Sequence, residues 1–410
     1  MALIPITDIL SQDQDALKAQ TNGTYDHRGY NNTISVFGDA VTGERVDDVS
    51  VKFQYNISDF DTTQTVSGSG AVSWANSIAT VTTGAGIGKG DLRSKDIVRY
   101  RPGHEAYAFF TSVFSTAEAD TTQRAGLFDV ENGFWFGYEN DVFGVGHRTG
   151  GVDAFVPQTS WNGDQLLSGN FTIDPTKMNI YKISYGWLGV APITFEVSCD
   201  NGKNWTVVHR IDLRNSQTVA SVENPMFPIR IEAESTNAPS SPITVSTASW
   251  NGGNISGRKN DTAYVDRYFS IDAGTQSITA NTPTNILTVR NPLTFQGKVN
   301  HVKSQLMLLS AAADGGKPIE ITTYKNANVS GTPVFNDVST NNSQLKFDIA
   351  GTTVSGGTKS FPVVLGKDSA MTINLKDMGL FLQPGDDVTF VAESTQGNDI
   401  TFAIRERSFF

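Results

Sequence analysis

The feature that most constrains this chain is the regular spacing of turns between short segments of alternating side chains. Turn signals fall at residues 102–103, 131–133 and 139–141, so the apolar stretches between 97 and 148 are interrupted about every eight residues. Such stretches are too short for the sustained 3.6-residue periodicity of amphipathic helices. The spacing is typical of antiparallel sandwiches and jelly rolls.

The same pattern continues towards the C-terminus with one interruption. An Asn-Gly hairpin signature lies at 200–203, and residues 250–258 combine several Gly and Asn without apolar periodicity, which indicates a break between domains. A charged fraction of 18% and 38 Gly in 410 residues fit short strands and many turns. We predict an all-β fold with two antiparallel, jelly-roll-like β-sandwich domains, residues 51–250 and 259–410, after a short N-terminal helical or extended anchor segment, residues 1–50.

The predicted anchor segment differs from the rest of the chain. A short amphipathic helix is expected over about residues 8–20, because Ser11 and Gln14 fit a capping box at its start. The apolar residues of this anchor are Ile6, Ile9, Leu10 and Leu17. A helix this short is marginal alone, so the apolar stripe should dock either on its own domain or on a partner protein.

Charge and cysteine content exclude several classes of function. The net charge of −11 and pI near 4.9 argue against nucleic acid as a partner. No apolar run is long enough for a transmembrane helix, and the first residues lack the features of a secretory signal, so we expect no membrane partner. Cys199 is the one cysteine, which precludes an intrachain disulfide and fits synthesis in a reducing cytoplasm. The pattern indicates no function for Cys199.

Catalytic and metal-binding motifs are not apparent in the sequence. The five histidines do not fall at metal-ligand spacings, and neither a nucleophile elbow nor a P-loop occurs. Asp129 and Glu131 flank one turn, Glu139 and Asp141 the next, and two such carboxyl groups could serve a glycosidase. Charged residues in turns are usually solvated, so we predict no catalytic residue, no metal and no cofactor.

Aromatic residues offer the clearest candidate contact surface. Alternation places Phe134, Phe136 and Tyr138 on one face of a strand and Trp135 on the other. One face should fill the core. The other is either buried between layers or exposed to stack on sugar rings or on another subunit. The candidate glycan or subunit contacts are therefore Trp135, Tyr138 and Trp161.

Residues 95–250 carry a succession of motifs that resembles a module of virion proteins. The motifs include Tyr100-Arg-Pro-Gly-His-Glu105, Gln123-Arg-Ala-Gly-Leu-Phe-Asp129, Asn132-Gly-Phe-Trp-Phe-Gly-Tyr138, His147-Arg-Thr-Gly-Gly151 and Tyr185-Gly-Trp-Leu-Gly189. The succession is similar to a module of tailed bacteriophages and of some large DNA viruses. The resemblance implies a jelly-roll-like sandwich in a fibre, spike, decoration or tail-associated protein. It implies no catalytic residues.

These observations together predict a non-enzymatic structural component of a phage virion, made in the host cytoplasm and docked by its N-terminal segment. Open sheet edges favour assembly as a symmetric homo-oligomer, with a trimer as the default expectation, beside other virion proteins. The alternative is a receptor- or glycan-binding module for host attachment, whose partner would be a host-surface saccharide. A third interpretation is a polysaccharide-degrading enzyme.

Overall fold

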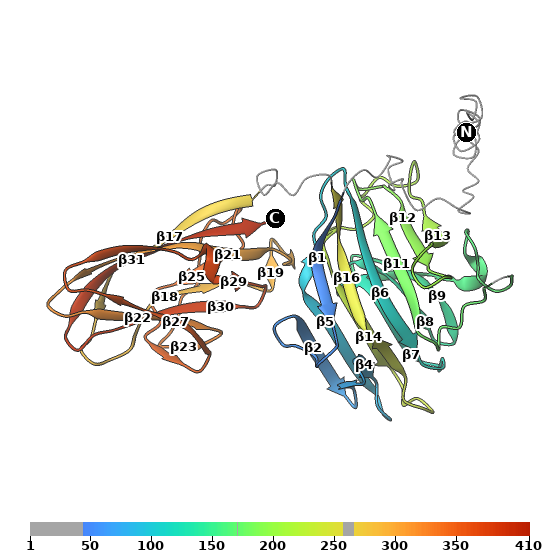
Figure 1. The fold of residues 1–410 in the computed structure, drawn as a ribbon, viewed down its shortest axis with the longest axis horizontal. Helices are drawn as coiled ribbons and strands as arrows, with labels where there is room; N and C mark the ends of the chain where they lie inside the picture. Colours follow the sequence, from blue (N-terminus) through green and yellow to red (C-terminus); the bar gives the residue numbers. More distant parts are fainter. Residues whose placement is uncertain (1–43, 170, 257–265) are drawn as a thin grey trace, which may run out of the picture. The chain divides into compact units, whose positions relative to one another are not determined.

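The computed structural model describes residues 44–169, 171–256 and 266–410. The chain divides into two compact units, unit 1 up to Lys259 and unit 2 from Asn260. Each unit is built from antiparallel β-sheets (Figure 1), which confirms the predicted all-β sandwich fold. Within the described ranges the helical elements are two three-residue turns, and none has the length and apolar character needed to cross a bilayer.

Unit 1 pairs a nine-stranded sheet with a seven-stranded sheet. Its elements are β1 Glu44–Lys52, β2 Thr62–Gly68, β3 Ala71–Ala75, β4 Ile78–Thr82, β5 Gly88–Val98, β6 Glu105–Phe114, β7 Thr121–Phe128, β8 Gly133–Glu139, β9 Val142–Thr149, β10 Val152–Pro157, η1 Gln158–Ser160, β11 Asn179–Tyr185, β12 Ile193–Val197, β13 Thr206–Ile211, β14 Phe227–Ser235, β15 Thr244–Thr247 and β16 Ser249–Ser256. The larger sheet runs β13-β12-β11-β6-β15-β4-β3, with β16 beside β6 and β1 beside β16. The smaller sheet runs β10-β9-β8-β7-β14-β5-β2.

Unit 2 has a five-stranded and a six-stranded sheet. Its elements are β17 Asp266–Ile278, β18 Thr284–Arg290, β19 Thr294–Phe295, β20 Lys298–Val299, β21 Lys303–Asp314, β22 Ile319–Lys325, β23 Asn328–Ser330, β24 Asn336–Asp337, β25 Lys346–Asp348, β26 Thr353–Ser355, β27 Thr358–Leu365, β28 Ala370–Asn374, η2 Lys376–Met378, β29 Phe381–Leu382, β30 Asp387–Glu393 and β31 Asn398–Phe409. One sheet runs β17-β31-β21-β28 with β29 beside β21, and the other runs β24-β25-β18-β30-β22-β27.

The core of unit 1 is aromatic. Phe134 and Phe136 of β8 point into it, as the alternation predicted, and the ring of Phe136 lies 4.8 Å from Tyr181 and 5.4 Å from Phe195. Ring pairs at such distances add to the gain from burial. Because successive residues of a strand point to opposite faces, the neighbours of these core residues face outward from the seven-stranded sheet.

Two of the predicted boundaries need correction. Residues 44–52 form β1, which pairs with β16, so the last part of the predicted anchor segment belongs to unit 1. The predicted break between domains, residues 250–258, overlaps β16, which spans Ser249–Ser256. Its glycines allow close packing: a Cβ at Gly253 would lie 2.0 Å from the carbonyl oxygen of Val46. The anchor residues Ile6, Ile9, Leu10 and Leu17 lie outside the described residues.

Candidate functional site

The three aromatic residues predicted as contacts belong to packed regions. Trp161 is 3% exposed and its ring meets those of Phe136 and Phe143 at 6.3 and 6.0 Å. Tyr138 lies near the C-terminal end of β8, where its side chain is half-buried and packs against the core. Trp135 faces outward from the sheet, yet its side chain is completely buried. Neither tryptophan presents a free ring face, so stacking of a sugar or a subunit on them does not fit this structure.

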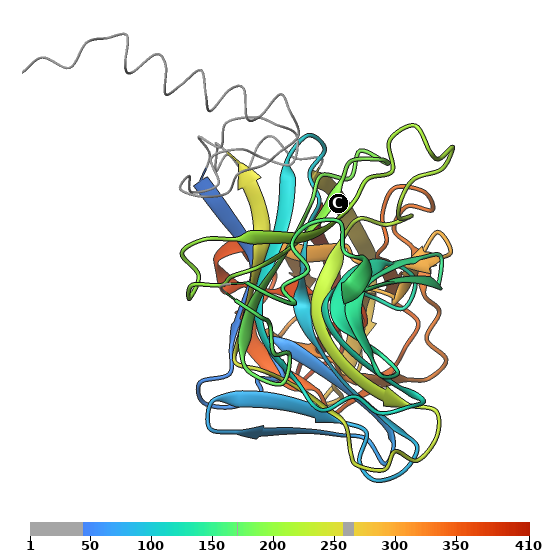
Figure 2. The same cartoon turned by 90° about the vertical axis from the view of Figure 1, so that its right-hand side faces the viewer.

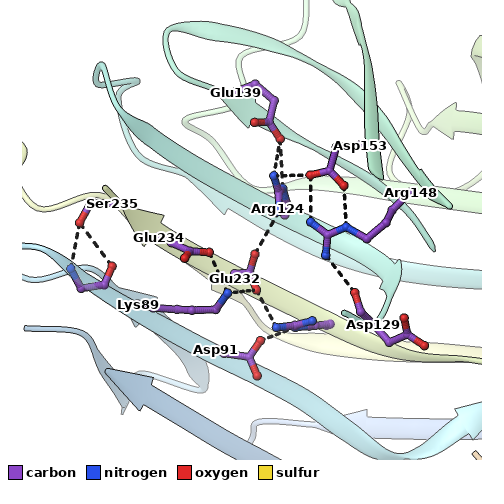
Figure 3. Close-up of polar contacts among 12 residues, drawn as sticks. Lys89, Asp91, Arg124, Asp129, Glu139, Arg148, Asp153, Glu232, Glu234 and Ser235 are labelled. Atoms are coloured by element: carbon purple, nitrogen blue, oxygen red, sulfur yellow. Dashed lines mark hydrogen bonds and ion pairs between the residues drawn. The ribbon is translucent and has the colours of Figure 1, made fainter. Parts of the chain in front are cut away.

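The outward face that carries Trp135 is instead occupied by charged side chains (Figure 3), and we call it the charged face. Its members are Lys89, Asp91 and Arg93 on β5, Arg124 on β7, Glu139 on β8, Arg148 on β9, Asp153 on β10, and Arg230, Glu232 and Glu234 on β14. They flank core residues such as Leu92, Ala125 and Ile231, and therefore point away from the core. The face carries five cations and five carboxylates, so its charges balance.

Strands β5 and β14 place like charges directly opposite each other. Glu232 pairs in register with Asp91, and Arg230 with Arg93. Like charges directly opposite each other are destabilising. The side chains avoid this repulsion by forming ion pairs with oppositely charged neighbours at diagonal positions. Arg230 forms an ion pair with Asp91 across the strands and another with Glu232 at 2.6 Å. The ammonium group of Lys89 lies 2.8 Å from Glu232 and 2.7 Å from Glu234.

Arg124 joins this cluster to the far strands of the sheet. Its Nη2 lies 2.8 Å from Glu139 and 2.9 Å from Asp153, and its Nη1 lies 3.3 Å from Glu232. Arg148 holds Asp153 through two nitrogens at 2.5 and 2.9 Å. Both guanidinium groups lie over the ring of Trp135, at 4.9 and 5.4 Å from its centre. This cation–π packing explains the burial of a tryptophan on an outward face.

Burial and neighbouring charges shift the pKa values of the carboxyl groups on this face in different directions. Burial alone would raise the pKa of Glu232, but the cations Arg230, Lys89 and Arg124 lower it to about 2. At Glu139, burial outweighs the attraction of Arg124 and raises the pKa. Glu232 and Asp91 are each 1% exposed, whereas Glu139, Asp153 and Glu234 have 24%, 31% and 40% of their side chains exposed. The centre of the face is therefore closed and its margin is open.

The open margin contains a row of polar side chains that crosses four strands, which we call the polar row. The row follows the register of the sheet: Lys89 is opposite Glu234, Glu234 opposite Thr122, and Thr122 opposite Glu139. Neighbouring positions lie about 4.8 Å apart. Within the described part of the chain, the hydroxyl of Thr122 has no hydrogen-bond partner but is buried from solvent. Oε2 of Glu139 and Oε1 of Glu234 also have no hydrogen-bond partner among the described residues, and both carboxylates are partly exposed. These two carboxylate oxygens keep capacity for a ligand.

Asp129, one of the four turn carboxylates that the sequence offered for catalysis, has a structural role. Asp129 is 2% exposed, and its Oδ1 accepts hydrogen bonds from the amides of Glu131 and Asn132, each at 2.7 Å. It therefore stabilises the turn between β7 and β8. Residues 44–169, 171–256 and 266–410 contain no cluster of three His, Cys, Asp or Glu suited to a metal ion.

Cys199 is half-buried beside the hydroxyl of Thr206, with 3.5 Å between sulfur and oxygen. Burial raises the pKa of its thiol. The thiolate is the reactive form, so this environment favours an inert cysteine.

The charged face was not predicted from the sequence, although a signal for part of it exists. Lys89-Gly-Asp-Leu-Arg93 and Arg230-Ile-Glu-Ala-Glu234 both alternate charged with small or apolar residues at period two. That pattern indicates strands with one charged face. It does not show that the two strands are neighbours.

Comparisons with known proteins give few constraints. No protein-family model matches the chain, and no curated protein matches it. Among solved structures it is similar to a β-1,3-1,4-glucanase (lichenase) from a mouse hindgut metagenome, with 9% identity and a TM-score of 0.33 over 50% of this chain and 98% of that one. It is similar to lectin I-B4 of Griffonia simplicifolia, with 14% identity and a TM-score of 0.30 over 50% and 99%. It is also similar to a Bauhinia forficata lectin in complex with GalNAc, with 15% identity and a TM-score of 0.31 over 52% of this chain and 100% of that one. Likenesses this weak carry no argument about a ligand.

Proposed function

We propose that this chain is a non-enzymatic glycan-binding protein and that the glycan lies along the polar row of the charged face. The observation that carries the proposal is the row itself. Lys89, Glu234, Thr122 and Glu139 stand at regular spacing on adjacent strands, and Glu234 and Glu139 each keep one carboxylate oxygen without a partner among the described residues. Sugar hydroxyls both donate and accept hydrogen bonds, and a glycan presents them at repeated intervals.

The carboxylates of the polar row are also positioned by ion pairs with the more buried part of the charged face, which supports a binding role. Glu139 is fixed by Nε and Nη2 of Arg124, and Glu234 by Lys89, while Arg124 and Lys89 both bind the buried Glu232. Groups fixed before the ligand arrives lose little conformational entropy on binding. Because cations and carboxylates balance across the face, the ligand we propose is a neutral, hydroxyl-rich oligosaccharide.

Binding fits the face better than hydrolysis does. Glu139 and Asp153 both contact Nη2 of Arg124, so these two carboxylates lie within about 6 Å of each other, in the range of a retaining glycosidase. Both oxygens of Asp153 already accept guanidinium hydrogen bonds, from Arg148 and Arg124. Glu232 and Asp91 are buried beyond the reach of a substrate. A nucleophilic carboxylate needs a free oxygen facing the sugar.

Substitution in the polar row tests the proposal. Glu139→Gln or Glu234→Gln should weaken binding of a neutral oligosaccharide at least tenfold, because one charge-assisted hydrogen bond contributes about 1.5–3 kcal/mol. The ligand is found on an array of neutral and acidic oligosaccharides, and affinities are then measured by calorimetry. Glu393→Gln, at an exposed carboxylate in unit 2, is the matched control and should bind like the wild type.

Three results would count against this proposal. They are the absence of binding across the array, binding that both row variants retain in full, and release of reducing ends by the wild type that Glu139→Gln abolishes. The last would identify a hydrolase. The tryptophan fluorescence of each variant shows whether unit 1 has remained folded.

We further infer that the binding serves a virus particle, with the chain as an attachment component of a phage virion. This inference is supported by the resemblance of residues 95–250 to virion modules. Antibodies to residues 266–410, viewed with gold on purified phage particles, should label one fixed position. Particles that carry neither label nor peptides of this chain in mass spectrometry would remove the inference while leaving glycan binding intact.

A further inference from the structure

The two sheets of unit 1 both end in exposed strands on the same side of the sandwich. β2 is the last strand of the seven-stranded sheet and β3 the last of the nine-stranded sheet, and one short turn connects them. Figure 1 labels β2 at the lower end of unit 1, and the blue strands at the bottom of Figure 2 are the same region. In β2 every residue after Thr63 is exposed. An edge strand of this kind leaves one row of backbone N–H and C=O groups for a further strand.

This edge lacks the features by which proteins usually protect an open strand. From Thr62 to Gly88 the chain contains no charged residue and no proline. The pairing of β2 with β5 runs from Thr62 opposite Ser94 to Gly68 opposite Gly88 without a bulge. Charged side chains, prolines and bulges are the common means of blocking edge pairing.

The other outer strands of unit 1 do carry such features. β10 contains Asp153 and ends at Pro157, and β13 contains Arg210. β1 pairs with β16 alone and has the sequence Glu-Arg-Val-Asp-Asp-Val-Ser-Val-Lys. The absence of protection is therefore specific to the side formed by β2 and β3.

Apolar side chains are exposed along the same side. Val66 on β2 is 53% exposed, Trp74 on β3 40%, and Ile87 before β5 60%. The loop that leads into β2 adds Tyr55 and Phe60, which is 91% exposed. Apolar groups gathered beside an unpaired edge are typical of an interaction surface.

We propose that two copies of this chain associate through β2, paired antiparallel about a two-fold axis at Thr65. The register places Thr65 opposite Thr65 of the second copy, Val66 opposite Gln64, and Ser67 opposite Thr63. Every pair is neutral, and cross-strand threonine pairs are favourable. The two seven-stranded sheets then join into one continuous sheet, with the same surface contributed by both copies.

A second copy is the occupant that the edge itself favours. Each chain carries a net charge of −11, so two copies repel each other least when the contact itself contains no charged side chain. The uncharged edge offers no charge pattern by which a different protein would be selected, whereas a two-fold antiparallel edge is complementary to itself. This arrangement is a dimer, in place of the trimer that the sequence led us to expect.

A charge at the axis tests the pairing. The full chain should sediment at micromolar concentration with twice its mass of 44.3 kDa. Thr65→Lys places two ammonium groups opposite each other and should weaken association at least tenfold. Thr218→Lys, at an exposed position in a loop, is the matched control and should leave association unchanged.

Cysteine cross-linking gives a positive test of the register in a Cys199→Ser background. Thr65→Cys should form a disulfide-linked dimer on oxidation, because directly opposed Cα atoms lie about 4.5–5.5 Å apart. Thr63→Cys alone should cross-link poorly, and Thr63→Cys combined with Ser67→Cys should cross-link well. A monomeric wild type, a trimer, or a dimer that Thr65→Lys leaves unchanged would each overturn the proposal.

Discussion

Replacing Arg230 by methionine is expected to destabilise unit 1 by about 3–5 kcal/mol at neutral pH. Arg230 is 4% exposed and neutralises Asp91 and Glu232, which are each 1% exposed. Removal of one partner from a buried ion pair leaves uncompensated charge in a medium that solvates it poorly. Two buried carboxylates would then face each other across β5 and β14.

The measurement can be confined to unit 1, because all six tryptophans lie between Trp74 and Trp250. Denaturant unfolding followed by tryptophan fluorescence should therefore report this unit alone. Arg214→Met is the control: that side chain is 84% exposed in its pair with Asp212, and its loss should change stability by less than about 0.5 kcal/mol. If Arg230→Met lowers the free energy of unfolding by less than about 1 kcal/mol, water reaches the charged face and screens these charges.

The same ion pairs predict a dependence on pH. Glu232 has its pKa lowered from 4.5 to about 2 in the folded chain. A depressed pKa means that the unfolded chain binds the proton more tightly, so the stabilisation is complete above pH 4.5 and is lost as the pH falls towards 2. The stability difference between the wild type and Arg230→Met should narrow over that interval.

Replacing Glu406 by glutamine is expected to stabilise unit 2 at neutral and alkaline pH. Glu406 points from β31 into the core of unit 2 and is completely buried. Its Oε2 accepts a hydrogen bond from Ser408 at 2.9 Å, and Oε1 has no partner among the described residues. Burial raises its pKa from 4.5 to about 8, which the hydroxyls of Ser408 and Ser304 oppose only in part.

A raised carboxyl pKa makes stability fall as the pH rises. Between pH 4.5 and about 8 the folded chain keeps a proton that the unfolded chain releases. Each pH unit in that interval lowers the free energy of unfolding of the wild type by at most about 1.4 kcal/mol. The Glu406→Gln variant should therefore be about 3 kcal/mol more stable than the wild type at pH 7 and equally stable at pH 4. Hydrogen exchange of peptides from residues 266–410, measured at pH values from 4 to 8, follows this unit.

Glu393→Gln serves as the control for Glu406→Gln, because it makes the same change at an exposed position of unit 2 and should leave the protection of that unit unchanged. Equal protection of the wild type and Glu406→Gln at every pH would show that Glu406 is already ionised and solvated in the folded chain.

The burial of Trp135 changes how the aromatic residues can be tested. A Trp135→Ala variant removes a side chain packed beneath Arg124 and Arg148, and such truncations cost about 3–5 kcal/mol. Loss of ligand binding in that variant would therefore reflect damage to the sheet. Variants of the polar row separate binding from stability, because Glu139 and Glu234 are partly exposed at the margin of the face.

The sequence by itself determined the features that depend on neighbouring residues. Turn spacing identified an all-β chain of antiparallel sandwiches, and period-two alternation placed Phe134 and Phe136 on the core side and Trp135 on the other. Asn201 and Gly202 both adopt the left-handed conformation that the predicted hairpin turn requires, with φ of 62° and 90°. Each of these properties is set within a few residues along the chain.

Only the tertiary structure decided which strands are neighbours, and the charged face depends on that choice. Lys89 and Glu232 are far apart in the sequence and meet because β5 pairs with β14. The same choice determined that Gly253 lies in a packed strand, that Trp135 is covered by two arginines, and that β2 remains at an edge. Strand pairing is a competition among all edges for hydrogen bonds and apolar burial, and a local pattern specifies the face of a strand but not its partner.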